Sequence, residues 1–135
     1  MAQPPVVCLA PSGITFAAEV AITVLPHPRP VPLLWVFRHL GARAVRALQQ
    51  RAATDDLTDH QVLCQVLVGW GQDPHAVPEG DDAPPPPWRG PVDAAGAPAP
   101  FSADALAELL DNHPAAGPEL WNGYLRELRR SRLGN

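Results

Sequence analysis

The chain has 135 residues, 18 of them proline, and a formal net charge of −4. This length allows one domain, and the excess of acidic over basic residues argues against nucleic acid as a partner. The first residues lack the basic start and continuous apolar core of a secretory signal, and no apolar run is long enough to span a bilayer. We therefore expect one cytosolic domain over residues 1–135, with reduced cysteines and no membrane partner.

Two segments near the N-terminus have the period-two apolar pattern of half-buried strands. The first segment, residues 16–24, turns its apolar side chains to one face: Phe16, Ala18, Val20, Ile22 and Val24. The second segment, residues 31–37, does the same with Val31, Leu33, Trp35 and Phe37. Residues 25–30 between them contain three prolines, which lack the N–H that a strand ladder needs. The pattern predicts a β-hairpin, whose apolar face must pack on other elements because an isolated hairpin is marginally stable.

Two helices are predicted after the hairpin. Residues 42–53 are rich in Ala, Arg, Leu and Gln, which favour helix. Thr58 precedes Gln61 by three residues, the arrangement of a capping box, and a second helix is predicted over residues 59–70. Its apolar side chains recur at helical spacing: Val62, Leu63, Val66, Leu67 and Trp70. We predict that this helix ends around Trp70, which two glycines flank.

Residues 71–100 contain nine of the 18 prolines and few apolar anchors. Such a composition favours an extended, solvated backbone, so we predict an irregular linker of poor order. Trp88 is the exception to watch. It either packs onto the domain or contacts a partner or a second copy of the chain.

Two more helices are predicted within residues 101–130. Ser102 is a good N-cap for the first, which has a short apolar stripe of Leu106, Leu109 and Leu110. Gly117 and Pro118 open the second, which has apolar side chains at every third or fourth position: Leu120, Trp121, Tyr124, Leu125 and Leu128. Four arginines gather at its end: Arg126, Arg129, Arg130 and Arg132. We interpret them as cations that favour a helix C-terminus, with a phosphate-binding patch as the alternative.

Together these elements predict an α+β fold, in which an N-terminal β-hairpin packs against about four α-helices. Within the single domain, residues 14–70 carry the hairpin and two helices. Residues 71–100 form the proline-rich linker, and residues 101–130 carry the two C-terminal helices.

The sequence offers little for catalysis or metal binding. His60 and Cys64 lie one helical turn apart and could form half of a metal site or a Cys–His pair, but no second pair has ligand spacing. The acidic pairs at 55–56 and 81–82 lack the regular spacing of a calcium loop. We therefore expect no metal, no cofactor and no enzymatic activity. A disulfide between Cys8 and Cys64 is possible but not expected in the cytosol.

Protein binding is the kind of function that remains. Large aromatic side chains are common anchors of binding surfaces, and five are candidate partner-binding residues: Trp70, Trp88, Phe101, Trp121 and Tyr124. For Trp70, Trp121 and Tyr124 the alternative is a place in the hydrophobic core. The sequence leaves both interpretations open.

The order of the first elements resembles the tail assembly chaperones of long-tailed (siphovirus-like) bacteriophages and prophages. Residues 16–22 (Phe-Ala-Ala-Glu-Val-Ala-Ile) and 36–40 (Val-Phe-Arg-His-Leu) carry the resemblance, as a strand pair that leads through an aromatic–basic step into a first helix. Residues 63–71 are similar to the second helix of that family, which commonly ends on a tryptophan.

The later elements extend the resemblance. Residues 100–110 resemble the family's next helix, and residues 118–124 resemble its last, where an aromatic residue in a position like Tyr124 is usual. The resemblance spans about residues 14–70 and 98–130. The intervening linker is longer and richer in proline than is typical of the family, and Gly41 stands where a polar helix cap would be natural.

The resemblance implies a non-enzymatic function in tail morphogenesis. Such proteins bind the long, helix-rich tape measure protein in the cytoplasm of the bacterial host, help recruit tail tube subunits around it, and are absent from the mature virion. In many of these phages a translational frameshift yields a longer form that contacts the tail tube protein, and this chain would be the short form. The implied partners are therefore the tape measure protein and, through a longer form, the tail tube protein. A homo-oligomer is compatible with this role.

The main alternative is a phage tail completion or head–tail connector protein, which would remain in the particle as a structural component. A small DNA-binding regulator is disfavoured by the acidic residues 54–101 and by the lack of a basic recognition helix. A metal or thiol enzyme is disfavoured by the isolated His60 and Cys64.

Overall fold

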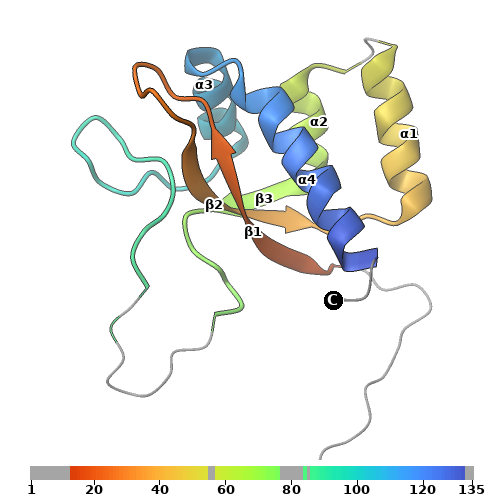
Figure 1. Cartoon of the computed structure of the whole chain (residues 1–135), viewed down its shortest axis with the longest axis horizontal. Coiled ribbons are helices and arrows are strands. Elements are labelled where there is room, and N and C mark those ends of the chain that lie inside the picture. The colour runs from red at the N-terminus through yellow and green to blue at the C-terminus, as the bar shows by residue number, and fades with distance from the viewer. Residues whose placement is uncertain (1–12, 55–56, 77–83, 85, 133–135) are drawn as a thin grey trace, which may run out of the picture.

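The computed structural model describes residues 13–54, 57–76, 84 and 86–132. The described residues form, in order, β1 (Thr15–Ile22), β2 (Val31–Arg38), α1 (Ala42–Ala53), α2 (Asp59–Val66), β3 (Leu67–Trp70), α3 (Ala103–Asn112) and α4 (Ala116–Arg132). The strands make one antiparallel sheet, and the helices gather on one side of it (Figure 1). The predicted α+β class, with an N-terminal hairpin packed against four helices, is confirmed.

The sheet has β2 at its centre, between β1 and β3. In the hairpin, Phe16 pairs with Phe37 and Ala18 pairs with Trp35, so the two predicted apolar faces form one face of the sheet. Ala18, Trp35 and Phe37 are buried. The hairpin therefore turns its apolar face toward the helices, which is the packing that an isolated hairpin lacks.

The predicted second helix is wrong in its last turn. α2 begins with the predicted capping box, because the Gln61 N–H donates to the Thr58 hydroxyl and the Thr58 N–H donates to the Gln61 side chain. It ends at Val66, however, and residues 67–70 form β3. The reason is tertiary: in extended form these four residues pair with the open edge of β2. A short apolar run has no period that separates strand from helix.

The hydrophobic core lies between the sheet and the helices. Its largest fully buried side chains come from both layers: Trp35, Tyr124, Phe37, Ile22, Leu63, Leu106, Leu120 and Val66. The indole N–H of Trp35 donates to the backbone oxygen of Val20 at 3.0 Å. This hydrogen bond satisfies the polar atom that the tryptophan brings into the core and ties β1 to β2.

α4 packs directly on β1, and a glycine permits the close approach. A Cβ atom at Gly123 would lie 2.7 Å from Cγ2 of Val20, which is closer than carbon atoms pack. One turn earlier, the Glu119 carboxylate accepts hydrogen bonds from the N–H of Thr23 at 2.7 Å and from its hydroxyl at 2.8 Å. The glycine and the carboxylate together hold α4 against β1 and the start of the hairpin connection.

Within the segment 71–100, the described residues 71–76, 84 and 86–100 belong to no named helix or strand, but they are not a loose linker. The Gly71 N–H donates to the oxygen of Leu34 at 2.8 Å, and the Arg89 N–H donates to the oxygen of Gly71 at 2.9 Å. The Leu34 N–H in turn donates to the oxygen of Arg89 at 2.8 Å. Gly71 and Arg89 thus both hydrogen-bond to Leu34 of β2, just beyond the end of β3. The prediction of poor order is corrected there, whereas residues 77–83 and 85 lie outside the described residues.

Candidate functional site

The five candidate aromatic residues are not brought together as one patch. Trp70 is 5% exposed, and its ring meets Phe101 edge-on with 5.0 Å between centroids and Trp35 with 6.0 Å. Its indole N–H donates to the backbone oxygen of Ala99 at 2.7 Å. Trp70 is therefore a core residue that anchors the chain before α3, and Phe101 is half-buried against it.

Tyr124 is fully buried near the end of β2. Its hydroxyl donates to the backbone oxygen of Arg38 at 2.9 Å and accepts from the Leu40 N–H at 3.2 Å. Its ring lies 5.2 Å from Phe37 and 5.7 Å from Trp121, between centroids. Burial raises the pKa of the Tyr124 phenol, against the smaller lowering effects of the Leu40 hydrogen bond and the Arg38 charge. The phenol is therefore held neutral, as a link between α4 and the turn after β2.

Trp88 packs onto the domain. It is half-buried against the core, and its ring covers Gly71, where an added Cβ atom would lie 2.5 Å from Cζ2 of the indole. Gly71 also has φ of +90°, a conformation that favours glycine. The Trp88 indole N–H donates to the oxygen of Pro91 at 2.9 Å, and the neighbouring Arg89 forms an ion pair with Glu19 of β1. Of the two interpretations of Trp88, the structure shows packing onto the domain.

Burial therefore separates the five candidates. Trp70 and Tyr124 offer almost no surface to a partner, whereas Trp88, Phe101 and Trp121 are half-buried at different places in the fold. A partner surface built from all five aromatic side chains is not present in the described structure.

His60 and Cys64 do meet, as their one-turn spacing predicts. Cys64 Sγ lies 3.5 Å from His60 Nε2, and the same nitrogen lies 2.8 Å from the backbone oxygen of Ala103. A ring nitrogen that faces a carbonyl oxygen carries the proton, so it does not accept one from the thiol. Burial raises the pKa of the Cys64 thiol, which is the opposite of nucleophile activation.

The described residues offer no further metal or disulfide chemistry. Across residues 13–54, 57–76, 84 and 86–132, His, Cys, Asp and Glu side chains form no group of three that could hold a metal ion. Cys64 is a free thiol, and Cys8, with which a disulfide was possible, lies outside the described residues. The acidic pairs at 55–56 and 81–82 also lie outside them.

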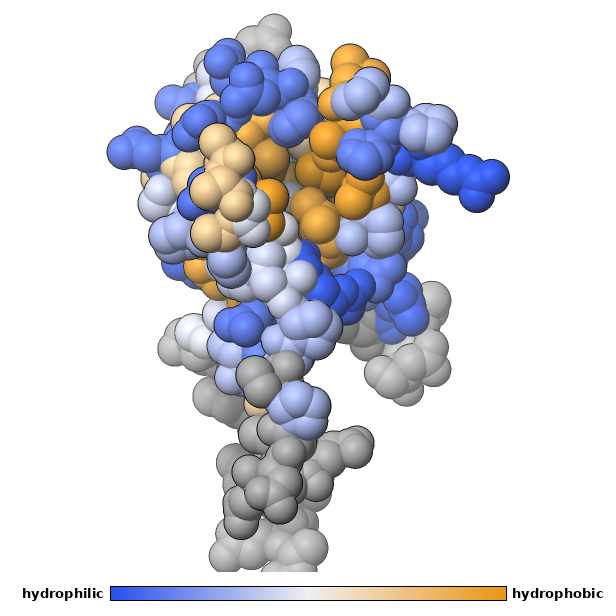
Figure 2. Space-filling view, turned by 90° about the vertical axis from the view of Figure 1, so that its left-hand side faces the viewer, coloured by the Kyte–Doolittle hydropathy of each residue, from blue (hydrophilic) through white to orange (hydrophobic). Residues whose placement is uncertain are grey.

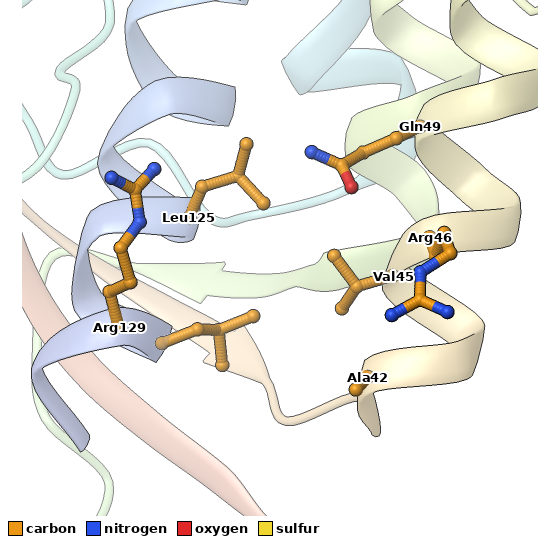
Figure 3. A pocket seen from close by; sticks show the side chains of 7 residues that line it. Ala42, Val45, Arg46, Gln49, Leu125 and Arg129 are labelled. Carbon is orange, nitrogen blue, oxygen red and sulfur yellow. The ribbon is translucent and has the colours of Figure 1, made fainter. Parts of the chain in front are cut away.

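A groove lies between α1 and α4 (Figure 3). It has a volume of about 170 Å³ and is lined by Ala42, Val45, Arg46, Gln49, Leu125, Leu128 and Arg129. Val45 and Leu125 point toward each other across it, and Arg46 and Arg129 stand on its opposite sides. The groove thus combines an apolar floor with a basic rim. We call it the α1–α4 groove.

The helices around this groove carry most of the basic residues of the chain. α1 has three arginines and no acidic residue, and residues 125–132 have four arginines and one glutamate. Seven of the ten arginines therefore lie on these two stretches, in a chain whose net charge is −4. Sequence reasoning missed the groove because it assigned the C-terminal arginines to the helix end. The sequence feature that could have indicated the groove lies in α1. Its first turn contains no acidic residue, although a helix N-terminus favours one.

A second apolar region lies on the side of the molecule that carries the hairpin turn. Figure 2 looks onto this side and shows apolar side chains gathered over part of it. Leu25 in the hairpin connection is 80% exposed, and Val92 in the following irregular segment is 55% exposed. Exposed apolar surface of this kind is a candidate contact region.

Neither a membrane-spanning helix in the described residues nor a known relative points to a function. In the described part of the chain, no helix has both the length and the apolarity to cross a bilayer. Comparisons with protein-family models, with curated proteins and with solved structures each found no match to this chain. The residues and the geometry above are therefore the basis for a functional assignment.

Proposed function

We propose that this protein is a tail assembly chaperone of a long-tailed phage or prophage. It binds the tape measure protein and helps recruit tail tube subunits during tail morphogenesis, in the cytoplasm of the bacterial host. It acts by contact and then leaves, so the mature virion does not contain it. A longer, frameshifted form would make the contact with the tail tube protein.

The ordered set of elements that resembles this family carries the proposal. Residues 16–22 and 36–40, which resemble the family's strand pair and aromatic–basic step, lie on the β1–β2 hairpin and on the turn into α1. Tyr124, which resembles the aromatic residue of the family's last helix, hydrogen-bonds the backbone of Arg38 and Leu40 in that same step. Two features that the resemblance links across the sequence are thus in direct contact, which supports treating them as one motif.

The surfaces of the molecule suit a contact role. The exposed Leu25 and the α1–α4 groove both offer apolar surface to a partner. Chaperones of this kind cover the apolar stripes of a helical client until tube subunits replace them. Each contact needs only modest affinity, because many copies on one long client supply avidity.

Co-expression with the tape measure protein encoded nearby tests the proposal. We expect the two proteins to co-elute in size-exclusion chromatography as a soluble complex with several copies of this chain, since repeated binding is what keeps a long apolar client in solution. The tape measure protein expressed alone is the control, and we expect it to be insoluble. If it stays insoluble when this chain is present, the proposal is wrong. Finding the chain in purified particles would instead support a tail completion or head–tail connector protein.

A further inference from the structure

We propose that the α1–α4 groove is the docking site for an acidic amphipathic helix of the client. This inference deepens the proposed function and rests on it for the identity of the client, the tape measure protein. The chemistry of the groove itself defines which segment of a client would bind: a helix with an apolar ridge and with carboxylates on both sides of that ridge.

The floor of the groove fits side chains of a larger partner. Val45 and Leu128 are each 7% exposed, and Leu125 is half-buried, so the floor is apolar and already packed from below. Its volume of about 170 Å³ is well under the roughly 300 Å³ at which small-molecule pockets begin. One or two aliphatic side chains from a helix ridge would fill it, as in other helix-in-groove contacts.

The rim of the groove sets the charge of the partner. Arg46 on α1 and Arg129 on α4 flank the floor, and neither forms an ion pair with a carboxylate of the described residues. Glu127, the one acidic residue in this part of α4, is paired with Arg130 at 3.3 Å. The helix dipole accounts for Arg129 near a C-terminus but not for Arg46 in the first half of α1. Carboxylates on both edges of a docked helix would complement both arginines.

Other occupants fit the groove less well. A phosphate backbone or an anionic bilayer surface would pair with the arginines but would place charge against the apolar floor. A second copy of this chain would offer the acidic face of α3, with Asp104, Glu108 and Asp111. The apolar ridge of α3 is unavailable, however, because Leu106 is fully buried in its own core. A partner helix that carries both features is the occupant that the groove favours.

The test uses the full chain and two synthetic helical peptides. One peptide carries a leucine ridge flanked by glutamates, and the other carries the same ridge flanked by lysines. We expect fluorescence anisotropy to show binding of the glutamate peptide at least about tenfold tighter than binding of the lysine peptide, because like charges across an interface are strongly unfavourable. In the double variant R46E/R129E this preference should reverse. The matched control R29E/R51E has the same change in net charge outside the groove lining and should keep the wild-type preference.

Several results would overturn the inference. Equal binding of the two peptides would do so, and so would an R46E/R129E variant that folds, as judged by circular dichroism, and keeps the wild-type preference. Self-association through the groove, seen by sedimentation and lost in R46E/R129E, would make a second copy the occupant. Tighter binding of an oligonucleotide or of anionic vesicles than of the glutamate peptide would exclude a helix.

The same double variant separates this inference from the proposed function. If R46E/R129E still co-elutes with the tape measure protein, the chaperone role stands and the groove is not its docking site. If the wild-type chain does not bind the tape measure protein but selects the glutamate peptide, the groove binds acidic helices and the proposed client is wrong.

Discussion

A single phenol connects two distant parts of the chain. The Tyr124 hydroxyl uses both its donor and its acceptor on the backbone at Arg38 and Leu40, where β2 passes into α1. A buried side chain that satisfies two backbone groups fixes the position of a turn more firmly than apolar packing does. At the residue scale, one hydroxyl oxygen therefore links the end of β2 to α4, in addition to the ring contact of Tyr124 with Phe37.

Replacing Tyr124 with phenylalanine tests this role. Y124F removes both hydrogen bonds and leaves the Leu40 N–H without its partner, so we expect a loss of about 1–3 kcal/mol in the free energy of unfolding. Denaturant titration of both proteins at neutral pH measures the difference. A loss no larger than that of an exposed substitution would show that the turn is held by ring packing alone.

The same residue predicts how stability depends on pH. Because burial raises the pKa of Tyr124, the folded state retains a proton that the unfolded state releases above about pH 10. Stability is thus fully present below that pH and falls as the pH rises toward the folded pKa. Y124F should lack this part of the alkaline decline, and since Cys64 contributes equally in both proteins, the difference isolates the phenol. Tyr124 is the only tyrosine, so tyrosinate absorbance reports its titration directly.

At the scale of elements, the contact of α4 with β1 depends on Gly123. Alanine is normally better than glycine inside a helix by about 1 kcal/mol, so G123A would stabilise an isolated α4. In the fold its Cβ would lie 2.7 Å and 2.8 Å from the two methyl groups of Val20, a buried strand residue. We expect G123A to destabilise the protein by about 1–3 kcal/mol, the cost of overpacking a core.

A double-mutant cycle provides the control for Gly123. In a V20A background the two methyl groups are gone, and G123A should then be neutral or stabilising because only the helix preference remains. If G123A has the same effect in both backgrounds, the distance between α4 and β1 is not set by this pair of residues.

The elements differ in how far the sequence predicts them, and the reason is the range of the interactions. Alternation in residues 16–22 and 31–37 predicts the hairpin and its buried face, since burial on one side is a local property of a strand. The end of α2 was not predictable in this way, because residues 67–70 become a strand only where the edge of β2 is present. The same holds for Arg89, whose pairing with Leu34 spans a long stretch of chain.

The candidate site shows the same division. Aromatic residue type led to Trp70 and Tyr124, which the fold uses in its core. The α1–α4 groove was not predicted because Arg46 and Arg129 line opposite sides of one groove only after α4 packs on the sheet. The sequence shows that α1 carries three arginines and no acidic residue. Only the fold shows that one of them, Arg46, lines a groove together with Arg129.

At the scale of the whole molecule, the stretch of chain from Gly71 to Arg89 begins and ends at the same place beside β2. The chain leaves the sheet at Gly71 and returns at Arg89, and these residues are joined by a backbone bridge that Trp88 covers. W88A should therefore lower the free energy of unfolding by about 2–3 kcal/mol, since it removes packing at the bridge. Denaturant unfolding of W88A beside the wild-type chain checks this, and a loss within about 0.5 kcal/mol, as for an exposed substitution, would show that the indole does not hold the bridge.

The bridge between Gly71 and Arg89 has an evolutionary consequence. A segment whose ends are fixed beside each other can gain or lose codons without changing the register of the strands that it joins. The prolines between Gly71 and Trp88 then require no rearrangement of the hairpin or the helices. Related genes would be expected to differ most in length at this point, while the residues on either side of the bridge keep their spacing to β2.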